Sequence, residues 1–309
     1  MKLNIYNKRY LFFAISAVII LIGLAAAFIS GINLDIQFKG GSVIVYSYEG
    51  DVNTEDLQSK IEDALDVEIS SIQDNFNEAL DMQSVSINVA GKETLSVEQK
   101  TALDKLFAED ETYKAMNFNL EEEMTVDPSI GFEYLSKGIY ALLIAAVLIV
   151  LYVWYRFRVM SGPSAGVMAL VALFHDILIV FSAFVIFKIP LNENFIAVIL
   201  TIIGYSINDT IVIYDRIREN LGVEQGAMPL NELVDMSLGQ SLGRTINTSV
   251  ATFGTMLITY VFANIYGIVS VQNFALPMMI GILAGFYSSF FLAPQLWVTW
   301  KTRAGKSGY

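Results

Sequence analysis

The chain has 309 residues, of which 54% are hydrophobic and 16% are charged, and its mean hydropathy of +0.53 excludes an ordinary soluble domain. Its net charge of −12 argues against a nucleic-acid binder, which needs a basic surface. Because the chain has no cysteine and one histidine, it offers no disulfide, no Cys-ligated metal and little for any other metal site, so we expect no cofactor.

Six apolar stretches are each long enough to cross a bilayer, which takes about 20 residues. Aromatic residues at their ends are typical of interfacial anchors. The first stretch follows Lys8-Arg9 and contains Ala25-Ala26-Ala27, so a cleavable signal peptide is an alternative, although the apolar run is long for one. The predicted spans, and hence a polytopic α-helical membrane protein, are 10–29, 138–155, 165–187, 195–214, 246–265 and 274–300.

Lysine and arginine positions predict the orientation, because cytoplasmic loops are enriched in them. With the N-terminus inside, 11 of the 19 basic residues lie in cytoplasmic segments, and the short outer loops hold only Lys188. Both termini are therefore expected in the cytoplasm of a bacterial plasma membrane. The predicted division is 1–30 with the first span, an extracytoplasmic domain at 31–137, and a five-helix remainder at 138–309 with a cytoplasmic loop at 215–245.

The predicted outer domain is strongly acidic, with 23 Asp and Glu against 7 Lys and Arg, which we interpret as a solvated surface. Strand patterns occupy 42–48, 68–73, 84–90 and 122–127. One helix is predicted over 54–66, and a second one opens at Ser96, which has Gln99 at capping-box spacing. The order β-α-β-β-α-β predicts a ferredoxin-like α+β domain. The domain has no histidine and no evident nucleophile, so it is expected to bind and not to catalyse.

The fourth span carries polar residues at membrane depth, where ionisable groups are costly and are functional candidates by default. Gly204, Asn208 and Asp209 lie in the string Gly204-Tyr205-Ser206-Ile207-Asn208-Asp209-Thr210. With the midplane near Gly204, Asp209 lies about 7 Å toward the cytoplasm. Desolvation favours the neutral form of a carboxylate, so Asp209 is a candidate proton carrier. The alternative is an Asp that only pins neighbouring helices.

The fifth span supplies the expected partner of Asp209. Steps of three and four residues place a polar stripe on one helix face, formed by Arg244, Thr248, Thr252, Thr255 and Thr259. With this span centred near Thr255, Thr248 lies about 10 Å and Arg244 about 16 Å below the midplane. We therefore predict an Asp209–Thr248–Arg244 relay, against the alternative of ordinary interhelical packing by threonine.

Two other spans carry weaker signals. The middle of the third span contains His175 and Asp176. This pair could form a secondary proton relay or a hydrogen-bonded packing element, and the sequence supports the two equally. Gly281 and Gly285 in the last span have the Gly-x-x-x-Gly spacing that permits close helix contact.

Several of these strings resemble the SecF branch of the SecD/SecF family of bacterial protein-export subunits, which is related to the RND transporter superfamily. The resemblance covers nearly the whole chain, and it includes the Gly40 and Gly41 motif after the first span. One departure is Gln37, where the family usually has Asp. The other strings that carry it are Phe174-His175-Asp176, Gly204–Thr210, Tyr214-Asp215-Arg216-Ile217-Arg218-Glu219-Asn220 and Arg244-Thr245-Ile246-Asn247-Thr248-Ser249.

The resemblance implies a membrane subunit that works with SecD and the SecYEG channel, and less directly with the SecA ATPase and YajC, to draw exported polypeptides outward on a proton or sodium gradient. It also implies ion-coupling roles for Asp209, Arg244 and Thr248. No second six-span half is present, which predicts a separate SecF-type chain and not a fused one. Two other functions are kept open, a small-molecule or lipid exporter and a passive assembly subunit. The sequence has no phosphate loop and no nucleophile with a base, so no enzyme is expected.

Overall fold

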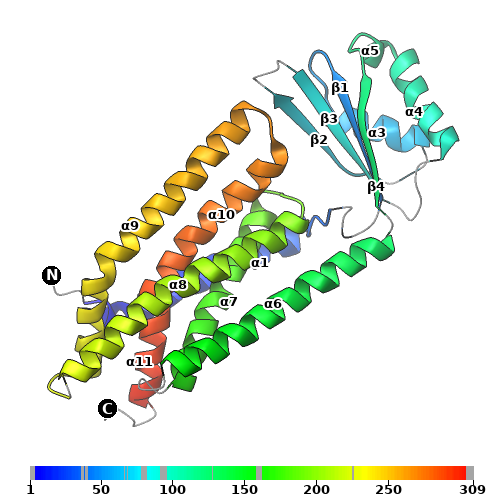
Figure 1. Cartoon of the computed structure of the whole chain (residues 1–309). Coiled ribbons are helices and arrows are strands. Elements are labelled where there is room, and N and C mark those ends of the chain that lie inside the picture. Colours follow the sequence, from blue (N-terminus) through cyan, green and yellow to red (C-terminus); the bar gives the residue numbers. More distant parts are fainter. Residues whose placement is uncertain are drawn as a thin grey trace.

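The computed structural model describes residues 4–35, 38, 41–65, 67, 69–77, 82–90, 96–126, 128–157, 162–224 and 226–303, so the motif positions Gln37 and Gly40 lie outside the described residues. The described chain forms a bundle of long helices and a smaller domain with a sheet, which lies beyond one end of the bundle (Figure 1). In the sequence, the sheet domain is inserted between the first helix of the bundle and the remaining ones.

All six predicted spans are confirmed as helices long and apolar enough to cross a membrane. The last span is interrupted by a π-helical turn, Ser288–Leu292, which we call the π-turn. The bundle contains α1 (Arg9–Ser30), α6 (Pro128–Arg156), α7 (Gly162–Ile186), α8 (Glu193–Glu224), α9 (Leu230–Ile265), α10 (Val269–Tyr287), the π-turn and α11 (Ala293–Arg303).

The connection predicted as a loop at 215–245 is mostly helix, because α8 continues to Glu224 and α9 already begins at Leu230. Apolar side chains explain the extra turns. Ile217 on α8 and Leu233 and Val234 on α9 are fully buried and join the core of the bundle. A helix whose apolar stripe continues past the bilayer remains helical, since that stripe still has a partner to pack against.

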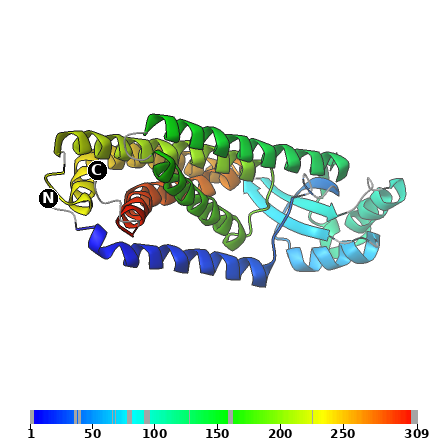
Figure 2. The same ribbon diagram turned by 90° about the horizontal axis from the view of Figure 1, so that it is seen from below.

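Helix α7 lies in the middle of the bundle and contacts α1, α6, α8 and α10. Figure 2 shows α1 and α6 on opposite sides, with α7 between them. Both outer helices expose most of their apolar surface, as lipid-facing helices do, whereas most of α7 is buried. Polar groups that face the centre of this bundle are therefore shielded from lipid and from water.

The smaller domain has a four-stranded antiparallel sheet in the order β2-β3-β1-β4. Its elements confirm the predicted order, although β2 and β4 are longer than expected and a short helix, α5, was not predicted. They are β1 (Gly41–Tyr48), α3 (Thr54–Leu65), β2 (Ile69–Asn77), β3 (Met82–Ala90), α4 (Val97–Glu109), α5 (Glu111–Lys114) and β4 (Asn119–Val126).

One face of this sheet packs on α3 and α4 to form a core of its own. Leu57 and Ile61 of α3 are fully buried there, and the rings of Phe107 and Phe118 stack with centroids 4.2 Å apart. The predicted capping box at the start of α4 is present, with Ser96 and Gln99 bonded reciprocally. The domain therefore has the packing and the caps of an independent structural unit.

Two backbone contacts tie distant segments to the bundle. Leu191, in the connection between α7 and α8, donates its N–H to Asn33 O (2.8 Å) and accepts from Asp35 N–H (3.0 Å). At the opposite end, Asp235 of α9 accepts from the Tyr6 N–H (3.1 Å). The segment leading into the sheet domain is thus held against the α7–α8 connection, and the N-terminal segment against α9.

Candidate functional site

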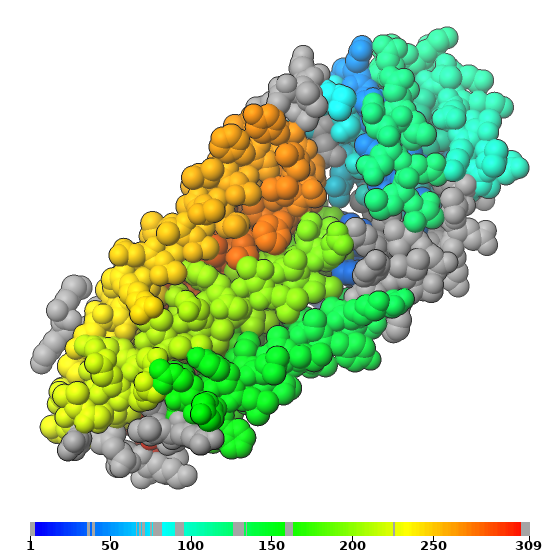
Figure 3. Space-filling view, in the orientation of Figure 1, coloured from blue at the N-terminus to red at the C-terminus, as the bar shows by residue number. Residues whose placement is uncertain are grey.

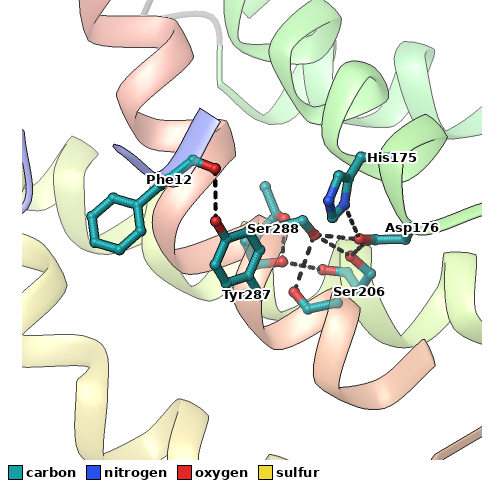
Figure 4. A network of polar contacts seen from close by, with 9 residues as sticks. Phe12, His175, Asp176, Ser206, Tyr287 and Ser288 are labelled. Atoms are coloured by element: carbon teal, nitrogen blue, oxygen red, sulfur yellow. Dashed lines mark hydrogen bonds and ion pairs between the residues drawn. The ribbon is translucent and has the colours of Figure 1, made fainter. Parts of the chain in front are cut away.

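A buried carboxylate joins three helices in the middle of the bundle. Asp176 of α7 is 1% exposed, and its Oδ2 accepts hydrogen bonds from Ser206 Oγ of α8 (2.6 Å) and from Ser288 Oγ of the π-turn (2.7 Å) (Figure 4). Two hydroxyl donors on one oxygen satisfy a carboxylate that has no access to water. Asp176 therefore fixes α7, α8 and the π-turn to one another.

The network continues along α8 through the next serine of the π-turn. Ser289 donates to the Ser206 backbone carbonyl (3.0 Å), and its hydroxyl pairs with the hydroxyl of Thr210 (2.8 Å). Ser206 and Thr210 lie one helical turn apart, and both are fully buried. The π-turn thus holds one face of the segment of α8 that also carries Asp209.

His175 completes this cluster on the side of α1. Its Nδ1 lies 3.0 Å from Asp176 Oδ1, and its ring stacks on Tyr287 with centroids 6.0 Å apart. The Tyr287 hydroxyl donates in turn to the backbone carbonyl of Phe12 (2.8 Å), as Figure 4 shows. The predicted pair of His175 and Asp176 therefore lies in a polar cluster on α7, α8 and the π-turn, and the stacked ring of Tyr287 connects that cluster to α1.

Asp209 has a different environment from Asp176. It is 2% exposed, and its Oδ2 is buried without any hydrogen-bond partner. A buried polar atom without a partner costs free energy, and the cost is greatest when the group is charged. Such a carboxylate gains most from binding a proton or another cation, which is the chemistry that the sequence predicts for this residue.

The register between α8 and α9 gives the level of Asp209. Tyr205 OH donates to Ser249 Oγ (2.9 Å), and nearer the other end of the pair Asn220 Nδ2 donates to Ser237 Oγ (2.8 Å). Interpolation between these contacts puts Asp209 level with the turn of α9 that runs from Thr245 to Thr248. From the sequence we expected Asp209 and Arg244 to differ in membrane depth by about 9 Å. The register between the two helices instead puts them within about one helical turn of each other along the bundle.

The structure brings the predicted relay residues onto facing turns without joining them by hydrogen bonds. Arg244 is exposed, and it forms no ion pair within 4.0 Å of any described carboxylate. The Thr248 hydroxyl donates to the Arg244 carbonyl (3.0 Å) on its own helix. The relay itself remains a prediction, with its three members within about one helical turn of one another along the bundle.

The polar stripe of α9 is not the buried face of this helix, since none of its residues is buried. Thr252, Thr255 and Thr259 each donate to a carbonyl four residues earlier on the same helix. These bonds satisfy the hydroxyls without any neighbouring helix, so the stripe need not face one. The polar residues on the buried face form another series at steps of four: Ser237, Ser241, Thr245 and Ser249.

Asn208 and Gly204 lie on the exposed side of α8, away from the Asp176 network. A Cβ added at Gly204 meets nothing within 4 Å, so neither close packing nor backbone geometry requires glycine there. Gly41 begins β1 with a φ of 142°, which is a reason for glycine at that motif position. The structure thus brings together Asp176, His175 and the buried face of the α8 segment that contains Asp209, whereas the Asn208 side chain lies on the exposed side of the same segment.

Sequence reasoning missed Ser206, Ser288 and Ser289 as members of the site. Serine is common in membrane helices, and only the contacts across 30 and 112 residues to Asp176 reveal its role here. Within the described part of the chain, no three His, Cys, Asp or Glu side chains gather as a metal site. The chemistry that this arrangement supports is the uptake and release of a small cation by a carboxylate.

Comparison with known proteins identifies the family. Residues 107–303 match the family model described as protein export membrane protein SecD/SecF, C-terminal. The chain is 33% identical to protein translocase subunit SecF of Helicobacter pylori strain J99, with 91% of this chain and 82% of that one covered. It is 32% identical to protein translocase subunit SecF of Thermobaculum terrenum, with 97% and 95% covered.

Longer relatives contain the same unit within a fused chain. The chain is 32% identical to protein translocase subunit SecDF of Bacillus subtilis, and it spans 38% of that protein's length. A crystal structure of SecDF from Thermus, a translocon-associated membrane protein, superposes with a TM-score of 0.81 at 30% identity, over 98% of this chain and 39% of that one. On the family match and the coverage of its SecF relatives, this multi-pass membrane protein belongs to the SecD/SecF family as a SecF-type subunit.

Proposed function

We propose that the chain is an auxiliary subunit of Sec protein translocation that works with SecD and uses a proton or sodium gradient to promote export across the bacterial plasma membrane. The observation that carries the ion-coupling part is the buried, unpartnered Oδ2 of Asp209. The export part rests on the names of its relatives, which are translocase subunits SecF and SecDF.

Ion binding at Asp209 changes the charge at the centre of the bundle and so favours one helix packing over another. With the carboxylate charged, attraction by Arg244, about one turn away on α9, favours the closer approach of these two side chains. With the carboxylate neutralised, that attraction is lost. One charge that crosses 100 mV supplies ~2.3 kcal/mol, enough to bias such a switch by roughly 50-fold.

The sheet domain, 31–137 in the predicted division, is proposed to be extracytoplasmic and ferredoxin-like. Support for the fold comes from the antiparallel order β2-β3-β1-β4, with α3 and α4 as the two helical connections. Support for the orientation comes from the excess of lysine and arginine in segments at the opposite end of the bundle, which also supports a cytoplasmic location of both termini.

A membrane partner is proposed to cover the side of α8 and α9 that carries small and polar residues. Thr201, Gly204 and Asn208 of α8 and Asn247 and Thr255 of α9 are exposed at membrane depth. Polar groups in lipid are unfavourable, and small residues allow two helices to approach closely. SecD is the occupant we propose for this face, since fused SecDF relatives carry the partner in the same chain. SecYEG, SecA and YajC are proposed as more distant partners.

The test is export of a secreted reporter in cells depleted of the native protein and supplied with wild type or Asp209→Asn. We expect the variant to accumulate unprocessed precursor while it still copurifies with SecD, because Asn keeps the shape of Asp but cannot take up a proton. Asp63→Asn, the same change at an exposed position of α3, is the control and should export normally. Normal export by Asp209→Asn at matched membrane levels would instead favour a passive assembly subunit.

A further inference from the structure

Two arginines meet where the first helix of the bundle begins and the last one ends. Arg9 is the first residue of α1, and Arg303 is the last residue of α11. The beginning of α1 packs on the last span, since the rings of Phe12 and Phe291 have centroids 4.5 Å apart. Figure 3 shows the face of the bundle that α9, α8 and α6 form, and α1 lies behind that face. We call Arg9 and Arg303 the arginine pair.

The guanidinium of Arg9 is held in one position by two tyrosines. Its Cζ lies 4.1 Å from the ring centroid of Tyr6 and 4.4 Å from that of Tyr10. Nη1 donates to the Tyr6 carbonyl (2.9 Å) and Nη2 to the Tyr10 hydroxyl (3.4 Å), whereas Nε is buried without a hydrogen-bond partner. Contact with both rings and two hydrogen bonds fix the plane of the guanidinium. The group is therefore preorganised and keeps N–H donors that no described residue uses.

The second arginine approaches the same hydroxyl from the other helix, because Arg303 also interacts with Tyr10. No described carboxylate lies within 4.0 Å of either member of the arginine pair or of the adjacent Lys8. Asp235 lies nearby on α9, but it accepts the Tyr6 backbone N–H (3.1 Å). Like charges that converge on one group repel each other. An anion between the two guanidinium groups would relieve this repulsion.

Exposed aromatic residues put the arginine pair at the level of lipid headgroups. Tyr10 is 56% exposed and Trp300 of α11 is 58% exposed, and such residues gather at the membrane–water interface. Directly after Tyr10, α1 exposes the apolar side chains of Leu11 and Ile15. A phospholipid has an anionic phosphate and acyl chains in the same arrangement. A free phosphate would leave the apolar surface unused.

We propose that the arginine pair binds the phosphate of an anionic phospholipid, whose acyl chains lie along the exposed surface of α1. Guanidinium forks match the oxygens of a phosphate, and basic sites between membrane helices suit anionic headgroups. In the proposed orientation this lipid belongs to the cytoplasmic leaflet. The bound headgroup fastens the start of α1 to the end of α11. This inference does not depend on the ion-carrying role proposed for Asp209.

The test counts the lipids that the full-length protein retains in detergent. The protein is titrated with phosphatidylglycerol or with phosphatidylcholine of the same chain length, and bound lipid is measured by native mass spectrometry. We expect wild type to bind one phosphatidylglycerol with a Kd about tenfold below that for phosphatidylcholine, and Arg303→Gln to raise the Kd for phosphatidylglycerol about tenfold. Arg216→Gln is the matched control, because this arginine of α8 already has Glu219 as its partner, and it should bind as wild type does.

Arg9→Lys provides a second variant if Arg303→Gln fails to accumulate. It keeps the positive charge but loses the planar fork, so it should also weaken phosphatidylglycerol binding. Equal affinity of wild type for the two lipids, or equal binding of phosphatidylglycerol by wild type and Arg303→Gln, would overturn the proposal.

Two further titrations distinguish a lipid from other anions. Displacement of phosphatidylglycerol by an equal concentration of inorganic phosphate would overturn the lipid assignment in favour of a free phosphate. The measurement is then repeated on the complex with SecD, where we expect the lipid to be retained. Its loss from that complex would also overturn the assignment, in favour of an acidic group of the partner.

Discussion

At the scale of single residues, the two buried carboxylates of the bundle differ in what satisfies them. Asp176 Oδ2 accepts two serine hydroxyls, whereas Asp209 Oδ2 accepts none. A fully hydrogen-bonded carboxylate is a fixed junction, because any movement breaks bonds that water cannot replace. An unpartnered one has no such bonds to lose. We therefore interpret Asp176 as the anchor and Asp209 as the group that binds and releases an ion.

This interpretation predicts that loss of a single anchor hydroxyl weakens the bundle. Ser288→Ala removes one of the two hydroxyl donors to Asp176 Oδ2 and should lower the free energy of unfolding by about 1–2 kcal/mol. Thr255→Ala is the control, since Thr255 is exposed and bonds only within its own helix, and it should change stability by less than about 0.5 kcal/mol. Unfolding of the full-length protein in mixed micelles measures both. Equal stabilities of the two variants would contradict the anchor role.

In the sheet domain, one ion pair predicts a dependence of stability on pH. The hydrogen bond from Lys60 (2.9 Å) holds the pKa of Asp110 below its usual value of 3.8. When a carboxylate has a lower pKa in the folded state than in the unfolded state, it stabilises the fold at pH values above its unfolded-state pKa. This stabilisation is lost as the pH falls through the folded-state pKa. The melting temperature of the wild type should therefore exceed that of Lys60→Met at pH 6, and the difference should close as the pH falls below the usual aspartate pKa of 3.8. Lys105→Met, at an exposed lysine of α4, is the control. A gap that is the same at both pH values would rule out this contribution.

At the scale of elements, the π-turn and the small residues of α10 decide how closely the last span packs on α8. A π-helical turn contains one residue more than an α-helical turn, and such turns are frequent at functional sites. Here it brings two consecutive serines, Ser288 and Ser289, onto the same segment of α8. Just before it, the predicted close contact of the Gly-x-x-x-Gly pair is confirmed, since an added Cβ at Gly285 lies 3.0 Å from the Ser206 side chain.

The same close packing predicts that adding one methyl group at Gly281 strongly destabilises the bundle. A Cβ at Gly281 lies 2.5 Å from two side-chain atoms of Ile202 and 3.0 Å from Val180, all of them buried. Gly281→Ala should therefore destabilise the bundle by about 1–3 kcal/mol through overpacking. Gly222→Ala, on α8, is the control because nothing lies within 4 Å of its Cβ, and it should be neutral or slightly stabilising. Thermal unfolding of the two variants in detergent separates these results, and a neutral Gly281→Ala would show that the α8–α10 contact is loose.

The helices and strands were largely predictable from sequence, whereas the face of α9 that is buried was not. Apolar runs fix the six spans, and the Ser96 capping box fixes the start of α4, because both signals are local. The polar stripe headed by Arg244 satisfies the helical period just as well as the series Ser237, Ser241, Thr245 and Ser249 does. The period shows that two polar faces exist, and only the neighbouring helix decides which of them is buried.

At the scale of the whole molecule, contacts between distant segments were beyond the reach of the sequence. The anchor joins residues 176, 206 and 288, and the N-terminal segment is held by Asp235 of α9, with no periodic signal for either contact. Among the described residues, two segments lead between the bundle and the sheet domain. The first connection is the segment after α1, in which residues 33–35 pair with Leu191, and the second runs from the end of β4 to the start of α6. Movement of α7 or α8 would therefore act directly on the first connection.

The most direct test of this account measures export against an imposed ion gradient. Inside-out vesicles that contain SecD, the SecYEG channel and either wild type or Asp209→Asn are loaded with a translocation intermediate, and its completion is followed after a pH step or a sodium step. We expect one of the two gradients to accelerate completion with wild type, by up to roughly 50-fold for 100 mV, and an ionophore to remove this acceleration. Asp209→Asn should complete at the slow rate whatever the gradient. Gradient-dependent completion by Asp209→Asn, equal to that of wild type, would contradict the claim that this carboxylate carries the ion.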